Sequence, residues 1–270
     1  MTNESRRSRR ARRLQRVVSG VKQGVVAALM AVSAACGTKD APDPLQPSGP
    51  TGRVRFVNVI TDPVRGRVNA ILEGVPFGVD LTYTLSTPTS LAAPSTAPYA
   101  AVLAGDRSII LKRTADTSVT VATLAFNITE GQDRSVYAIG GAGATPITAF
   151  VTTDENPTPA AGQVRLRVVQ LSPTAGAVDV FVTAVGADLA AATPAVANLA
   201  YRGVSTYLTP AAGTYQIRFV PAGTAPANRA GAVVINVASL TLASGAARTI
   251  VAADNNVGGA PLRAFVLTDR

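Results

Sequence analysis

Histidine and cysteine, two residue types that are widely used in catalysis, are nearly absent from this chain. It contains no histidine and a single cysteine, Cys36, which excludes Ser-His-Asp and Cys-His catalysis and most catalytic zinc sites. Carboxylates remain, because 15 of the 16 Asp and Glu residues follow Cys36, and a glycosidase needs only two of them about 5 to 10 Å apart. Most occur singly in sequences typical of turns. We therefore expect no catalytic residue, with a carboxylate-based glycan hydrolase as the alternative.

Two short polar stretches contain enough side-chain oxygens to be considered as calcium ligands. These are Asp154-Glu155-Asn156 and Asp254-Asn255-Asn256. A dedicated calcium site needs six to eight oxygens in fixed geometry, and neither stretch matches an EF-hand loop. No glycine-rich phosphate-binding motif stands between a strand and a helix. We therefore expect turns here, no metal site and no cofactor, with a calcium-assisted carbohydrate or adhesion module as a further alternative.

One carboxylate has an unusual sequence environment. Asp179 lies among valines in a segment typical of a strand interior, where Asp is disfavoured. Arg165 and Arg167 lie on what we predict to be a neighbouring strand. The expected arrangement is an ion pair across the outer face of the sheet, which contributes less than about 1 kcal/mol if it is exposed. The functional alternative is that Asp179 faces a ligand.

The elements that position these residues are predicted to be β-strands. Apolar and polar residues alternate with a period of two, as in residues 164–168 (VRLRV) and 215–219 (YQIRF). β-Branched residues dominate, and Gly or Pro interrupts the pattern at intervals of about 8 to 12 residues. The one plausible helical stretch, Ala187 to Leu199, is broken by Pro194. We therefore predict an all-β fold of antiparallel, immunoglobulin-like β-sandwich domains with about seven strands each.

The chain also contains an internal duplication. Residues 53–75 match residues 163–185 without gaps at an offset of 110, and two later blocks match at offsets of 108 and 115. We therefore predict two tandem domains, residues 53–155 and 162–270, joined by a short linker that contains two prolines. The identical pairs include Val54/Val164, Arg55/Arg165, Val59/Val169, Pro63/Pro173, Gly66/Gly176, Val68/Val178, Tyr99/Tyr207, Gly105/Gly213 and Ile109/Ile217.

The second copy resembles a known family. Residues 165–173 (RLRVVQLSP), 177–182 (AVDVFV) and 207–219 (YLTPAAGTYQIRF) are similar to the opening strand, the Ser-Pro turn, the Val-Asp-Val strand and the Gly-x-Tyr strand of the DUF4397 family. The family occurs in secreted and lipid-anchored bacterial proteins and has no established activity. The resemblance therefore implies two such domains over residues 53–270 and a location outside the cytoplasm. The first copy departs from the pattern at Asp62, Asn69 and Arg107.

The N-terminal segment has the composition of an export signal. Residues 1–35 contain eight basic residues and one acidic residue, and they end in an apolar run from Val25 to Ala35. This run is too short to cross a membrane, which takes about 20 residues, but it fits a secretory signal peptide. Without residues 1–35 the net charge falls from +9 to +2, so we expect no binding to nucleic acid. The twin-arginine export route is disfavoured, because Arg12-Arg13 lacks the usual Phe-Leu-Lys continuation.

Cys36 directly follows a run of small residues. The sequence from Val32 to Cys36 resembles a bacterial lipobox, although Ser33 stands where lipoproteins usually have Leu. Lipid attachment at Cys36 is the favoured interpretation, and cleavage by ordinary signal peptidase is the alternative. The rest of the segment 36–52 contains four prolines and no apolar periodicity. We expect it to be a disordered, extended linker.

Together these features predict a non-enzymatic lipoprotein of the bacterial cell envelope. We expect it to be anchored by lipid in the outer membrane or on the cell surface, with secretion or a periplasmic location as the alternative. The expected partners are the membrane, through the lipid, and another envelope protein or a glycan. A purely structural spacer is a further possibility.

Overall fold

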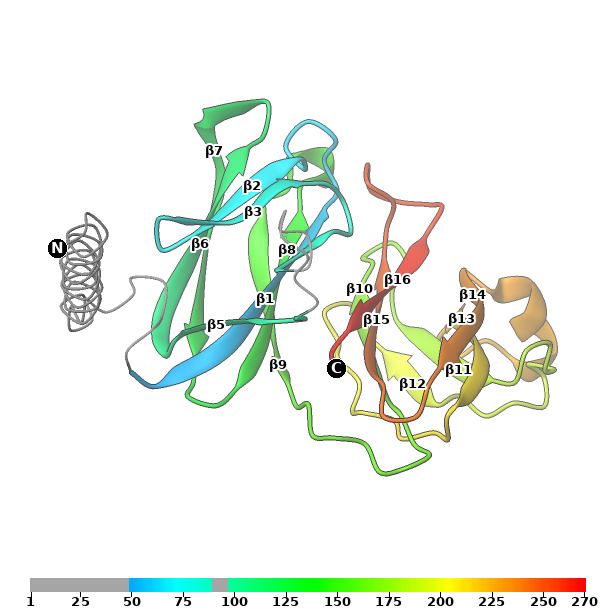
Figure 1. Ribbon diagram of the computed structural model, residues 1–270. Coiled ribbons are helices and arrows are strands. Elements are labelled where there is room, and N and C mark those ends of the chain that lie inside the picture. Colours follow the sequence, from blue (N-terminus) through cyan, green and yellow to red (C-terminus); the bar gives the residue numbers. More distant parts are fainter. Residues whose placement is uncertain (1–48, 89–96) are drawn as a thin grey trace, which may run out of the picture. The chain divides into compact units, whose positions relative to one another are not determined.

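Strands account for nearly all the regular structure in the computed structural model, which describes residues 49–88 and 97–270 (Figure 1). Residues from Gly49 onward form one compact unit. The predicted export signal and Cys36 lie outside the described residues. The first strand begins at Thr51, two residues inside the predicted linker. Among the described residues, no helix has the length and apolar character needed to cross a membrane.

The first copy consists of two sheets packed face to face. Its inner sheet has the order β4-β1-β8-β9, with β5 also paired to β1, and its outer sheet has the order β3-β2-β6-β7. The core between them contains alternate residues of the outer strands, for example Leu124, Phe126 and Ile128 of β7. The strands are β1 (Thr51–Ile60), β2 (Val68–Leu72), β3 (Val75–Leu81), β4 (Ser86–Thr87), β5 (Ala100–Leu103), β6 (Gly105–Arg113), β7 (Asp116–Ile128), β8 (Asp133–Gly140) and β9 (Thr148–Asp154).

The second copy repeats this arrangement. Its inner sheet has the order β10-β15-β16, and its outer sheet has the order β12-β11-β13-β14. In the second copy, isolated bridges from β10 to Leu208 and to Val204 take the places of β5 and β4, which pair with β1 in the first copy. The elements are β10 (Arg165–Leu171), β11 (Val178–Thr183), β12 (Val196–Leu199), β13 (Gly213–Pro221), β14 (Ile235–Leu242), β15 (Ala247–Ala253) and β16 (Arg263–Thr268), with the 3₁₀ helices η1 (Ala142–Ala144) in the first copy and η2 (Pro226–Ala232) in the second. The prediction of an all-β fold of two tandem sandwich domains is confirmed.

One strand pair in each copy runs parallel, whereas the sequence pattern predicts antiparallel strands. These pairs are β1 with β8 and β10 with β15. The inner strands are buried on both faces, so that six consecutive residues of β10 are buried. Strands buried on both faces have nearly continuous apolar sequences. The residues Val57, Val59 and Ile60 of β1 show this pattern.

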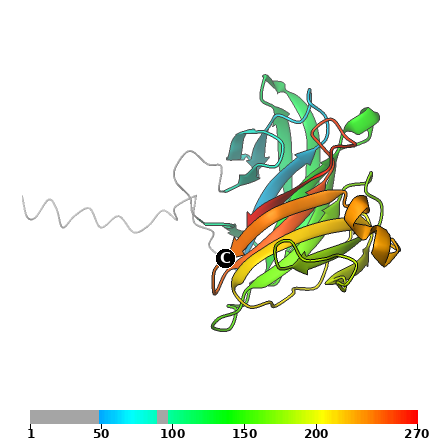
Figure 2. The ribbon, with the colours of Figure 1, turned by 90° about the vertical axis from the view of Figure 1, so that its right-hand side faces the viewer.

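The two copies share a second apolar core. The inner sheets contribute Val57, Val59, Tyr137 and Ile139 from the first copy and Val169, Leu171, Val251, Ala253 and Leu267 from the second. This core explains why the inner strands are buried on both faces, and Figure 2 shows the inner strands of the two copies side by side. The copies are therefore joined by packed side chains as well as by the linker.

The strand register corrects the predicted alignment of the copies. Arg55 stands opposite Ser135 in β8, and Arg167 stands opposite Thr249 in β15. Arg55 is therefore equivalent to Arg167, at an offset of 112, and the predicted pairing with Arg165 is wrong. A shift of two residues leaves every side chain on the same face of a strand. The alternation of residue types therefore fits both offsets equally well.

Candidate functional site

Two buried arginines occupy equivalent places in the copies. Arg55 and Arg167 are each only 1% exposed. The Nε atom of Arg55 donates to Ser135 Oγ at 3.0 Å, and that of Arg167 donates to Thr249 Oγ1 at 2.8 Å. We call the surrounding group the interface network; it comprises Arg55, Tyr99, Ser135 and Asp154 from the first copy and Arg167, Tyr207, Thr249 and Asp269 from the second.

Each arginine of the interface network pairs with an aspartate of the other copy. Arg55 Nη2 lies 2.9 Å from Asp269 Oδ1, and Arg167 Nη2 contacts Asp154 Oδ1. Each guanidinium also donates to the carbonyl oxygen of the residue before that aspartate, at 2.8 and 3.1 Å. The charges buried in one copy are therefore balanced by the other copy.

The interface network contains two carboxylates that lie close together, but in an environment that does not suit hydrolysis. Asp154 and Asp269 approach the same Nη2 atom of Arg55, at 3.4 and 2.9 Å, which places them close together. Neither side chain has exposed surface. Burial alone would raise the pKa of Asp154, but the guanidinium groups of Arg167 and Arg55 lower it below its usual range. A general acid needs a raised pKa and access to substrate, so this pair is structural.

Asp179 stabilises a bulge at a sheet edge. Its carboxylate accepts a hydrogen bond at 2.8 Å from the main-chain N–H of Asn198, whose φ is 52°. In the first copy, the side-chain oxygen of Asn69 accepts a hydrogen bond at 2.8 Å from the main-chain N–H of Asp80, whose φ is 55°. In both places the register between the paired strands shifts. A side-chain acceptor at a bulge explains a polar residue in the middle of a strand.

The arginines predicted beside Asp179 lie elsewhere. Arg167 belongs to the interface network, and Arg165 lies with its Cζ atom 4.3 Å from the centre of the Tyr207 ring. Strands β10 and β11 are in different sheets. No ion pair among the described residues involves Asp179. The structure therefore does not bring these three residues together.

The two stretches considered for calcium have structural contacts. Asp254 accepts hydrogen bonds from the hydroxyls of Ser172 and Thr174 and from the N–H of Gly259. Asn156 donates to Asp133 at 2.7 Å. In the part of the chain that the structure describes, no group of three or more His, Cys, Asp or Glu is placed to hold a metal ion.

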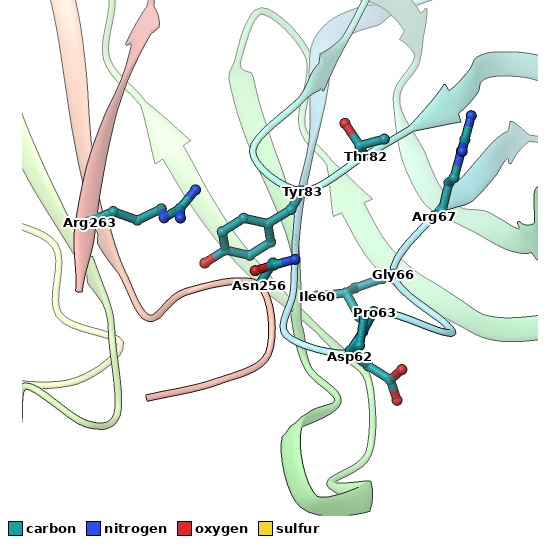
Figure 3. A pocket seen from close by; sticks show the side chains of 9 residues that line it. All are labelled: Ile60, Asp62, Pro63, Gly66, Arg67, Thr82, Tyr83, Asn256 and Arg263. Atoms are coloured by element: carbon teal, nitrogen blue, oxygen red, sulfur yellow. The ribbon is translucent and has the colours of Figure 1, made fainter. Parts of the chain in front are cut away.

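A groove lies where loops of the two copies meet (Figure 3). Its volume is about 450 Å³. The side chains of Tyr83 and Arg263 point toward each other, with Arg263 Cζ 5.7 Å from the ring centre. This first groove is lined by Ile60, Asp62, Pro63, Gly66, Arg67, Thr82, Tyr83, Asn256 and Arg263.

Most charges of the first groove are neutralised within the protein. Asp62 accepts from Arg65 Nε at 2.6 Å, and Arg67 forms an ion pair with Asp80. The hydrogen bond from the Arg65 main chain, followed by that from its side chain, lowers the pKa of Asp62. Arg263 is exposed, and its guanidinium has no carboxylate partner among the described residues. It is the cation left available to a ligand.

A second groove has a volume of about 400 Å³ and is also lined by residues of both copies. Ile60 lines the first groove, and its chain neighbours Val59 and Thr61 line the second. Arg202 lies with its Cζ atom 5.6 Å from the Tyr201 ring. The other lining residues include Ile139, Gly140, Ala142, Thr145, Pro146, Thr148, Leu171, Pro173 and Asp254.

The two grooves together are suited to binding an anionic group. An exposed guanidinium beside an aromatic ring offers paired N–H donors next to an apolar surface. Sequence reasoning missed Tyr83, Tyr201, Arg202 and Arg263, because each lies in a loop or at a strand end, where no periodic pattern exists.

The chain matches the model of a family described as Domain of unknown function (DUF4397), over residues 52–181 and 183–270. The division between the matches falls within β11. No curated protein is similar enough to this chain to match it.

Two solved structures share remote similarity with the chain. The Bacillus anthracis TIE protein is 10% identical, with a TM-score of 0.21, over 75% of this chain and 34% of that one. A leucine-rich repeat protein from Bacteroides thetaiotaomicron is 13% identical, with a TM-score of 0.17, over 76% of this chain and 26% of that one. This chain therefore spans about a third of the first structure and a quarter of the second.

Proposed function

Since the chain belongs to the DUF4397 family, we propose that it is a non-enzymatic binding protein of the bacterial cell envelope, held at a membrane by a lipid on Cys36. The anchor follows from the basic leader, the short apolar run and the only cysteine in the sequence. The folded unit would then be carried on a proline-rich tether.

The observation that carries the binding function is the pair of grooves that are lined by residues of both copies. Concave sites with a few polar groups are the usual places for ligands. The chain offers them little reactive chemistry, because it has no histidine. The carboxylate pair of the interface network, Asp154 with Asp269, is buried and occupied by arginines.

The anchor is tested by metabolic labelling with a fatty-acid precursor. We expect label in the wild-type protein and none in the Cys36→Ala variant, together with release of the variant from the membrane fraction. Equal labelling of both proteins would refute the lipid anchor.

The absence of enzymatic activity is tested with a panel of purified glycans and an assay for newly formed reducing ends. We expect no release above buffer. Release by the wild type that disappears in the Asp154→Asn variant, with the fold retained, would show that the carboxylates are catalytic after all.

A further inference from the structure

Each copy has a tyrosine in an equivalent loop. In both copies, the main-chain carbonyl oxygen three residues beyond the buried arginine accepts from the N–H of a residue with positive φ. These N–H groups belong to Thr84, with φ 72° and a distance of 2.8 Å, and to Arg202, with φ 61° and a distance of 2.7 Å. The residues before them, Tyr83 and Tyr201, are therefore equivalent.

Only one of these tyrosines packs against the apolar core that the two copies share. Tyr83 is partly buried against this core, and its hydroxyl donates to the carbonyl oxygen of Asp254 at 2.5 Å. In the described part of the chain, the apolar residues that pack against the shared core do not include Tyr201, which is 37% exposed. The two equivalent places therefore differ, because a tyrosyl ring covers the core in one of them and leaves it uncovered in the other.

The second groove reaches the shared core beside Tyr201. Three of its lining residues, Val59, Ile139 and Leu171, belong to that core, and Tyr201 lines the groove as well. Its volume of about 400 Å³ lies near the lower end of the usual range for ligand pockets, which is about 300 to 1,000 Å³. A small ligand in this groove would cover apolar surface, as the ring of Tyr83 does in the equivalent place.

The charge that remains available in the second groove is positive. Arg202 is exposed and has no carboxylate partner among the described residues; its guanidinium contacts Thr148 Oγ1 at 3.3 Å. The one carboxylate among the lining residues is that of Asp254, which is 3% exposed. Both of its oxygens accept hydrogen bonds from within the second copy.

We propose that the second groove binds a small aromatic carboxylate, whose ring covers the shared core and whose carboxylate pairs with Arg202. This inference rests on the proposed binding function and assigns its class of ligand. An aromatic ring suits the apolar lining, because the ring of Tyr83 packs against the same core in the equivalent place. The planar guanidinium matches a carboxylate through two parallel hydrogen bonds.

The test is a titration of the full mature chain carrying Cys36→Ser with 3-(4-hydroxyphenyl)propionate, followed by NMR of the methyl groups. This acid carries the phenol ring of a tyrosine side chain and one carboxylate. We expect saturable shifts at the methyl groups of Val59, Ile139 and Leu171. The corresponding uncharged amide should bind at least roughly tenfold more weakly, because hydrogen bonds between charged groups are the stronger ones.

Two variants locate the ligand in the groove. Arg202→Gln should weaken binding of the acid roughly tenfold and leave binding of the amide unchanged. Thr148→Trp should abolish binding of both, because Thr148 lines the groove and an indole ring would fill it.

Each variant has a matched control. Arg263→Gln removes an exposed guanidinium beside the equivalent tyrosine, Tyr83. Thr123→Trp places an indole ring at an exposed position of β7, outside both grooves. Neither control should change the affinity. Unchanged denaturation midpoints for all four variants establish that they are folded.

Several results would overturn the proposal. These are equal affinities for the acid and its amide, binding that survives Thr148→Trp, and shifts confined to methyl groups outside the second groove. Equal or tighter binding of hexanoate would also overturn it, because the site would then accept any apolar anion. A chain that is labelled at Cys36 but binds none of these probes would refute the ligand class and leave the anchor intact.

Discussion

Replacing Arg167 with Met tests whether the interface network holds the two copies together. The change keeps an unbranched side chain of similar length but removes donors to Thr249, to the Thr153 carbonyl oxygen and to Asp154. Asp154 would then face Arg55 alone among cations, at 3.4 Å. A carboxylate with no exposed surface would have lost its closest countercharge.

The expected cost follows from this burial. Removing one partner of a buried ion pair costs about 3 to 5 kcal/mol, because the remaining charge stays out of water. For a folded unit of this size, 1 kcal/mol corresponds to a shift of about 2 to 4 °C in the melting temperature. We therefore expect Arg167→Met to lower the melting temperature by roughly 6 to 20 °C.

The assay is thermal and urea denaturation followed by circular dichroism, with Arg165→Met as the matched control. Arg165 lies two residues earlier on β10, stacks on Tyr207 and has no carboxylate partner among the described residues. Its replacement should cost at most about 1 kcal/mol. Equal losses in the two variants, or a loss under about 1 kcal/mol for Arg167→Met, would refute the reasoning.

Three further predictions concern pH, connectivity and a turn. The pKa of Asp154 is lowered in the folded protein. The ionised carboxylate therefore stabilises the fold fully above the unfolded-state pKa of about 3.9, and this stabilisation is lost as the pH falls through the folded-state pKa. Urea midpoints should drop below about pH 4, and a flat profile in that range would contradict the prediction. A protease site inserted in residues 155–162 should allow cleavage without separation of the copies on gel filtration, since they share an apolar core; separate elution would disprove the shared core. Gly66→Ala should destabilise the folded protein by on the order of 2 kcal/mol, because a Cβ there would collide with the Asp62 carbonyl oxygen. Gly231 has open space around it, so Gly231→Ala should leave the stability unchanged. Similar melting temperatures for the two variants would count against the turn argument.

The outer sheets follow the sequence pattern closely, and the inner sheets do not. In β7 the buried residues alternate with exposed ones, because only one face contacts a core. In β10 both faces are covered, so a strand predicted to alternate is buried almost throughout. The second covering layer comes from the other copy, and no local pattern encodes it.

In the alanine-rich segment from Ala187 to Leu199, packing and Pro194 override the helix propensity of the alanines. It contains no helix; its last residues form β12, and Leu189 is buried against Phe181 and Val220. Pro194 prevents a continuous helix. The open edge of β11 offers Val196 a strand partner.

The candidate site was less predictable than the fold for a similar reason. Arg167 and Asp179 were both identified from the sequence as polar residues on strands, but their partners were not. Asp154 follows a strand and precedes two polar residues, so its sequence is typical of a turn. Its buried role depends on Arg167, 13 positions later on a strand of the other copy, and on Arg55, 99 positions earlier.

The cross-pairing of the arginines also sets an order of assembly. Arg55 lies on β1, yet it bonds to residues 213 and 214 positions later. Contacts so distant in sequence form late, because a long loop must close first. Until Thr268 and Asp269 are in place, the guanidinium of Arg55 has only its acceptors within the first copy, Ser135 and Asp154. We expect the first copy to be less stable in this state than in the complete folded unit.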